Sequence, residues 1–131
     1  MRPRFARMGD FEDGLTLREK RLLKQAVAAF ERAVESDPTH VHAWFWLAVT
    51  RDNRGQEADA IPAYERAISL GLDGEDLTRA LAWLASSYSK TARHHEAVTA
   101  ITRAADLGGY MPTEEFDALR RQVLRRSGRR T

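Results

Sequence analysis

The stretch AWFWLAVTRDNRGQEADAIPAYERA, residues 43–67, predicts two helices joined by a tight turn. Apolar and aromatic residues recur every three or four positions on both sides of Asn53, Arg54 and Gly55, as they do along one face of a helix. Small residues stand where two helix backbones must approach closely, and large residues fill the spaces between helical turns. The stretch is therefore expected to fold as a hairpin of two packed helices.

This pattern repeats along the chain. An offset of 34 residues pairs Ala26, Ala29, Phe30, Arg32, Ala33 and Val34 with Ala60, Ala63, Tyr64, Arg66, Ala67 and Ile68. An offset of 37 residues extends this set to Ala97, Ala100, Ile101, Arg103, Ala104 and Ala105, and it also pairs Trp46, Leu47 and Ala48 with Trp83, Leu84 and Ala85. The three extra residues fall in the connection 71–74, where an insertion costs little. Such repetition indicates that hairpins stack to bury a shared core.

The same periodicity, with the residues that end helices, predicts six helices. They cover residues 17–36, 40–53, 56–70, 74–91 and 94–107, and a sixth begins near Thr113. A capping box formed by Thr16 and Glu19 is expected to start the first helix. Residues 1–14 are predicted to be a loosely ordered segment, residues 15–126 a helical repeat domain, and residues 127–131 a basic disordered tail.

The composition restricts the class of protein. The chain of 131 residues has the length of one domain, and its 43% hydrophobic and 31% charged residues are typical of a soluble globular protein. Cysteine is absent, which excludes disulfides, thiolate metal sites and a cysteine nucleophile. No apolar run approaches the ~18 residues of a membrane span, and no signal peptide is recognisable, so a cytoplasmic protein is expected.

The period of 34 residues and the residue types at these spacings resemble the tetratricopeptide repeat (TPR) family. The resemblance covers residues 17–110, and it is best over 41–74 and good over 78–111. The positions that depart from the family pattern are Leu72, Leu81, Ala92 and Gly109. The resemblance implies an all-α fold, a right-handed superhelix of antiparallel helix pairs. It would hold about two and a half repeats, the first lacking its first helix, and a C-terminal capping helix.

In TPR proteins the first helices of successive repeats line a concave groove, and the resemblance assigns nine residues of this chain to it. They are His42, Phe45, Trp46, Val49, Asn53, Arg79, Trp83, Ser86 and Lys90. The helical period agrees, because Trp44 and Leu47 must face the partner helix and leave the other side for these residues. The implied function is a non-catalytic protein–protein interaction module that binds a peptide or protein segment in this aromatic groove.

Two other interpretations stay open. In the first, the aromatic surface is covered by the N-terminal segment, by the last helix or by a second copy of the chain, which would make the protein a homodimeric scaffold. In the second, the arginine-rich C-terminus binds nucleic acid by neutralising phosphates. The arginines concerned are Arg120, Arg121, Arg125, Arg126, Arg129 and Arg130.

Motifs for catalysis or metal binding are missing from the sequence. Adjacent helical residues point about 100° apart, so His94, His95 and Glu96 cannot easily share one ion. No phosphate-binding loop and no glycine-flanked nucleophile is present. We therefore expect no enzymatic activity, no cofactor and no bound metal.

Overall fold

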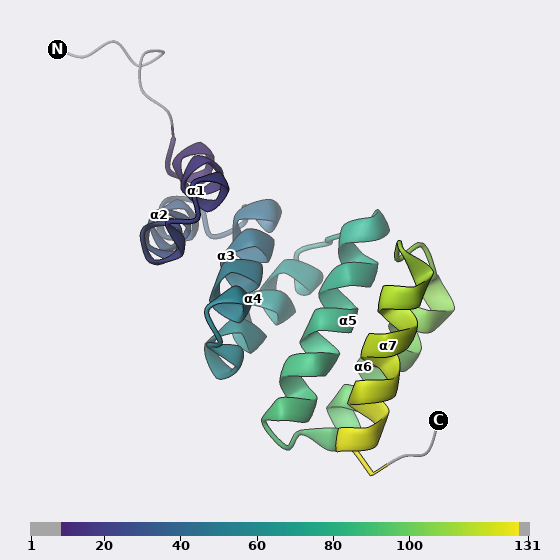
Figure 1. Ribbon diagram of the computed structural model, residues 1–131. Helices are drawn as coiled ribbons and strands as arrows, with labels where there is room; N and C mark the ends of the chain where they lie inside the picture. Colours follow the sequence, from purple (N-terminus) through teal and green to yellow (C-terminus); the bar gives the residue numbers. More distant parts are fainter. Residues whose placement is uncertain (1–8, 129–131) are drawn as a thin grey trace, which may run out of the picture.

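The computed structural model describes residues 9–128, and this part of the chain contains seven α-helices and no β-strand (Figure 1). The helices are α1 (Asp10–Glu19), α2 (Leu23–Ser36), α3 (Val41–Asn53), α4 (Glu57–Ser69), α5 (Gly74–Lys90), α6 (His94–Leu107) and α7 (Thr113–Arg126). Helices pack in the pairs α1–α2, α3–α4 and α5–α6, and α7 packs on both α5 and α6. The predicted all-α stack of helical hairpins with a final additional helix is confirmed.

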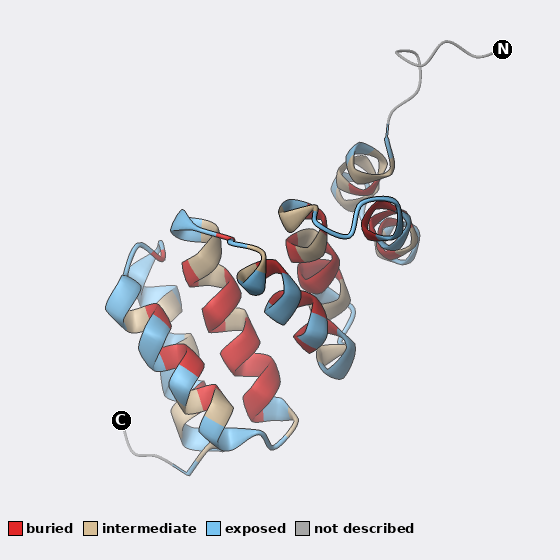
Figure 2. Ribbon diagram, turned by 180° about the vertical axis from the view of Figure 1, so that it is seen from behind, coloured by how far each residue is buried: buried red, intermediate tan, exposed pale blue. Residues whose placement is uncertain are grey.

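Small residues at equivalent positions let the two helices of each pair approach closely. Ala26, Ala60 and Ala97 have no exposed surface, and the large side chains of Phe30 and Tyr64 are equally buried. Figure 2 shows the buried residues as stripes along the helix sides that face neighbouring helices, with exposed residues outside. The repeat seen in the sequence is therefore a repeat of packing contacts.

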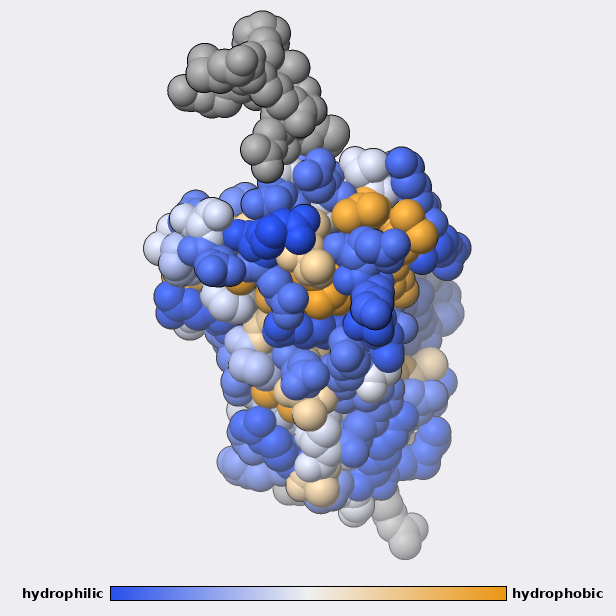
Figure 3. Space-filling model, turned by 90° about the vertical axis from the view of Figure 1, so that its left-hand side faces the viewer, coloured by the Kyte–Doolittle hydropathy of each residue, from blue (hydrophilic) through white to orange (hydrophobic). Residues whose placement is uncertain are grey.

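The face at the left-hand side of Figure 1, where the first hairpin lies, is mostly hydrophilic (Figure 3). Only small hydrophobic patches interrupt it. The end unit of a stack has no neighbouring repeat on its outer side, so a polar outer face is needed there for contact with water.

The N-terminal region differs from the prediction of a single helix over residues 17–36. The structure has two helices there, α1 and α2, with a turn at residues 20–22 between them. Thr16 lies inside α1 and Glu19 ends it, so the predicted capping box is wrong. Residues 10–14, predicted to be loosely ordered, belong to α1. The first hairpin is thus complete, whereas the later helices lie within one residue of their predicted ends.

The remaining parts of the predicted terminal segments lie mostly outside the described residues. Ser127 and Gly128 follow α7 as a turn, and residues 1–8 and 129–131 are not among the residues that the structure describes. The predicted order of those residues stays a prediction.

Gly14 explains why α1 has a weak local signal and forms all the same. Glycine inside a helix is unfavourable by itself, which argues against a helix when residues 10–19 are judged alone. In the structure Gly14 is buried where α1 crosses α2, and a Cβ added to it would lie 2.5 Å from Cε1 of Phe30. Packing against α2 therefore stabilises α1 and requires the missing side chain.

The turn between the helices of each pair contains a residue with a left-handed backbone. Arg21, Gly55 and Ala92 occupy this position in successive pairs, with φ angles of 63°, 75° and 63°. Only Gly55 has the residue type that adopts this conformation without strain.

We predict that Gly14→Ala destabilises the protein. The added methyl group overpacks the contact with Phe30, which costs about 1–3 kcal/mol, and the better helix propensity of alanine offsets up to about 1 kcal/mol of this. Chemical denaturation measures the difference. The cost should be smaller in a Phe30→Leu background, and an equal cost in both backgrounds would contradict the packing explanation.

Opposite substitutions at the turn position should have opposite effects. Ala92→Gly relieves a strained left-handed residue and is expected to stabilise the fold by up to about 1 kcal/mol, while Gly55→Ala should destabilise it by about 1 kcal/mol. A Cβ at residue 55 meets no atom within 4 Å, so the second effect comes from the backbone alone. Thermal unfolding of both variants tests the pair, and changes of the same sign would rule out this interpretation.

Candidate functional site

A pocket of about 510 Å³ opens on the side of the stack that α1, α3, α5 and α7 line together. We call it the aromatic groove. Its lining residues are Arg18, Trp46, Val49, Asp52, Asn53, Tyr64, Trp83, Ser86, Lys90, Glu115 and Leu119. Six of the nine residues predicted from the sequence are among them, and they come from α3 and α5. The helical period therefore brings these six side chains to one side of the molecule.

A chain of ring contacts connects the two tryptophans of the groove. The ring of Phe45 meets that of Trp46 edge-on at 5.2 Å between centroids. The same Phe45 ring stacks on Trp83 at 6.2 Å with 19° between the planes. Trp46 and Trp83 remain partly exposed, whereas Phe45 is only 1% exposed. Phe45 thus supports the tryptophans from below.

The ring contacts continue from Trp83 to the final helix. Trp83 meets Tyr110 edge-on at 6.4 Å, and its Nε1 donates a hydrogen bond of 3.1 Å to the Tyr110 hydroxyl. Tyr110 in turn donates to Glu115 at 2.9 Å and lies 5.5 Å from the ring of Phe116. We call Trp46, Phe45, Trp83, Tyr110 and Phe116 the aromatic row. The aromatic row attaches α7 to the groove.

Three predicted residues lie outside the pocket lining. Phe45 is buried beneath it because Trp46 and Trp83 cover its ring. His42 and Arg79 lie near the starts of α3 and α5, beyond the length of the pocket. Both approach Asp76, with Nε2 of His42 at 3.8 Å and Nη1 of Arg79 at 3.9 Å. Val49 and Ser86 do line the pocket but are largely buried and form its floor.

The sequence prediction did not include the lining residue Arg18, because α1 was not expected. Its Nη1 donates to Thr50 Oγ1 at 2.8 Å and to Asn53 Oδ1 at 3.0 Å. The guanidinium also lies 4.9 Å from the ring of Trp46, and burial lowers the pKa of Arg18. The offset of 34 residues, which pairs Gly14 with Ala48, is the signal that would have placed α1 and Arg18 here.

The last helix also contributes to the groove. Glu115 and Leu119 on α7 line the pocket opposite Arg18. Of the alternative in which the N-terminal segment, the last helix or a second copy covers the aromatic surface, the structure shows that the last helix borders the pocket, while residues 1–8 lie outside the described residues. Within the described residues, α1 and α7 form walls and leave the pocket open between them.

The charged groups of the groove are balanced in sign. Asp52 accepts a hydrogen bond of 2.9 Å from the Tyr64 hydroxyl, and burial raises the pKa of Asp52 above its usual value of 3.8. Burial and the nearby carboxylate together raise the pKa of Tyr64 well above 10.0. Lys90 lies 3.4 Å from Glu57 at the groove edge. The groove thus combines an aromatic surface with hydrogen-bond donors and acceptors along its edges.

His40 has a structural role at the start of α3. Nδ1 of His40 accepts a hydrogen bond of 3.1 Å from the Ala43 amide at the start of α3, and its ring lies 4.6 Å from that of Phe11. Among residues 9–128 no group of three histidine, aspartate or glutamate side chains is arranged to hold a metal ion. In that part of the chain, no helix has the length and apolar character needed to cross a membrane.

Two family models match the sequence. One, described as tetratricopeptide repeat, matches residues 11–76, and another with the same description matches residues 78–107. The first match includes the whole of α1 except Asp10, which agrees with the complete first hairpin.

Similar proteins come from curated sequences and from solved structures. A peroxisomal targeting signal receptor of Komagataella phaffii is 40% identical over 79 residues, 60% of this chain but only 13% of that receptor. The type III secretion chaperone SycD of Yersinia enterocolitica, solved with a peptide of the translocator YopD, has a TM-score of 0.69 at 18% identity, over 91% of this chain and 87% of that one. The crystal structure of MamA has a TM-score of 0.67 at 21% identity, and the match covers 87% of this chain and 71% of MamA.

Replacing Asp52 should change how stability depends on pH. The folded state raises the pKa of Asp52, so it holds this proton more tightly than the unfolded chain. Stability must then fall as pH rises from about 3.8 through the folded pKa. Asp52→Asn keeps an acceptor for Tyr64 and cannot ionise. As pH rises over this interval, the free energy of unfolding of the variant should therefore increase relative to that of the wild type. Parallel pH profiles of the two proteins would contradict the prediction.

Proposed function

Since this chain belongs to the tetratricopeptide repeat family, we propose that it is a non-catalytic interaction module that binds an extended or helical segment of a partner protein in the aromatic groove. One observation carries the proposal: two partly exposed tryptophans from successive hairpins share a pocket of about 510 Å³. SycD, which has this fold, was solved with a bound peptide.

The groove has the features of a binding hot spot. Tryptophan side chains in pockets that partners desolvate contribute much of the binding energy of protein interfaces. Trp46 and Trp83 supply such surfaces, and Phe45 and Tyr110 hold them in place so that little entropy is lost on binding. Asn53, Ser86 and Lys90 along the same pocket offer polar groups to a partner backbone.

Self-association through the same surface is the competing interpretation. A second copy of the chain seated in the aromatic groove would leave no room for a foreign segment. Light scattering at several concentrations separates the two, because a monomer keeps the groove accessible and a tight dimer through the groove does not.

Nucleic-acid binding by the arginine-rich C-terminus stays a prediction. Arg120, Arg121 and Arg125 are exposed on α7, while Arg126 donates to Ser89 Oγ at 3.1 Å. Arg129 and Arg130 lie outside the described residues. Retention on immobilised nucleic acid that is lost steeply with salt would support this function, and absence of retention at low salt would exclude it.

The groove proposal is tested with peptides selected from a random displayed library against the wild-type protein. Trp46→Ala should weaken each groove-bound peptide about 30-fold or more, because a hot-spot side chain contributes at least about 2 kcal/mol. Trp46→Ala with Trp83→Ala should abolish binding.

The matched control is Trp44→Ala. Trp44 is the third tryptophan of the chain, and it lies outside the groove, where its Nε1 donates to the Pro38 carbonyl at 2.8 Å. Circular dichroism checks that all variants keep their helicity. Unchanged affinity in the Trp46 variant, or equal loss in the Trp44 variant, would mean that partners bind elsewhere.

A further inference from the structure

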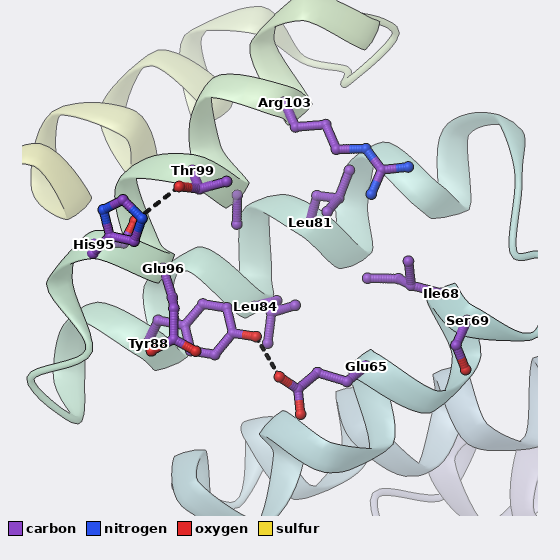
Figure 4. Close-up of a pocket in the computed structure, with 11 residues that line it drawn as sticks. Glu65, Ile68, Ser69, Leu81, Leu84, Tyr88, His95, Glu96, Thr99 and Arg103 are labelled. Atoms are coloured by element: carbon purple, nitrogen blue, oxygen red, sulfur yellow. Dashed lines mark hydrogen bonds between the residues drawn. The ribbon is translucent and has the colours of Figure 1, made fainter.

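A second pocket, of about 460 Å³, lies between α4 and α6 with α5 as its floor (Figure 4). It shares no lining residue with the aromatic groove. Trp83 and Ser86 of α5 face the groove, while Leu81 and Leu84 line the second pocket, so the two sites lie on different sides of α5. The function proposed for the groove does not use this site.

The second pocket exists because α4 and α6 pack on α5 rather than on each other. The surface that lines the gap is mainly apolar, and Leu81 and Leu84 of α5, Ile68 of α4 and Ala100 of α6 contribute to it. Ala100 is small, so α6 does not fill the gap. A cavity of this size and character falls within the range of pockets that hold small ligands.

The carboxylates at one end of the pocket already have partners. Tyr88 donates a hydrogen bond to Glu65 Oε2, and Figure 4 shows this bond at the lower edge of the pocket. Arg93 pairs with Glu96, lies 3.8 Å from Glu65 and covers the Tyr88 ring at 4.6 Å. These contacts satisfy both carboxylates and fix that end of the pocket.

Arg103 lies at the opposite end of the pocket and, unlike Glu65 and Glu96, has no charged partner among the described residues. Its side chain lines the pocket, and its guanidinium extends over the apolar floor near Leu81 (Figure 4). Among residues 9–128 no carboxylate lies within 4.0 Å of it, and it donates no hydrogen bond. The pocket therefore combines an apolar floor with a cation that has no anionic partner in the described part of the chain.

We propose that this second pocket binds an amphiphilic carboxylate, a small molecule with an apolar chain or ring and one carboxylate. The apolar part lies on Leu81, Leu84 and Ile68, and the carboxylate pairs with the planar guanidinium of Arg103, which matches it in geometry. Glu96 and Arg103 are seven residues apart on α6, about 10 Å at 1.5 Å per residue, which sets the length of chain that fits. The carboxylates at the Glu96 end disfavour a second anionic group there.

Decanoate is a suitable probe, and decanol and decylamine are neutral and cationic control compounds of equal chain length. Binding is followed below micelle-forming concentrations by amide chemical shifts of the lining residues of α4 and α6. The wild type should bind decanoate saturably, decanol more weakly and decylamine most weakly. Arg103→Gln should lower the affinity for decanoate about three- to tenfold and change the affinity for decanol by less than about twofold, because only the carboxylate pairs with residue 103.

Thr99→Trp supplies a steric test. Thr99 is an exposed residue that lines the pocket, and an indole there should fill the gap and remove binding of decanoate and decanol alike. Thr102→Trp is its matched control, since Thr102 is an exposed threonine of the same helix outside the lining. Thr102→Trp should bind like the wild type.

Each outcome decides the proposal. No saturable decanoate binding by the wild type, equal binding of decanoate and decylamine, or unchanged binding in Thr99→Trp overturns it. Thermal unfolding checks each variant, and if Thr99→Trp does not fold, the loss of preference for decanoate over decanol in Arg103→Gln decides alone. Neither result depends on the aromatic groove, because peptide capture by the groove should be intact in the Arg103 and Thr99 variants.

Discussion

The stacked contact between Phe45 and Trp83 connects the second hairpin to the third, and the geometry of the groove depends on it. Trp83 also contacts Tyr110, which in turn contacts Glu115 and Phe116 of α7. Aromatic pairs of this kind contribute about 0.5–1.5 kcal/mol beyond the burial of their surface. The same rings that hold neighbouring elements together present the two tryptophans to solvent, so stability and binding surface have one origin here.

Much of the fold follows from sequence, because the repeat is encoded by packing. Alanines with no exposed surface recur at the offsets of 34 and 37 residues, and this recurrence predicts α3 to α6 almost to the residue. The failure at α1 has a physical cause. Gly14 weakens the local helix signal, yet it is required where α1 crosses α2 and Phe30 leaves no space for a Cβ. Tertiary packing outweighs local propensity there.

The candidate site was predictable where helical period alone decides which side a residue faces. Trp46 and Trp83 follow from that rule. Arg18 and Glu115 do not, since their place depends on how α1 and α7 dock, and the burial of Phe45 depends on the rings around it. The second pocket could not be predicted from the sequence either, because it arises from the spacing between α4 and α6 rather than from any motif.

The aromatic row holds α7 to the repeats. Hydrogen exchange of the α7 amides in Trp83→Ala tests this attachment, since local opening reports local stability. Loss of the indole should speed exchange across α7 about tenfold or more, while Trp44→Ala leaves these rates unchanged. Exchange in α7 as slow in Trp83→Ala as in the wild type would contradict the claim.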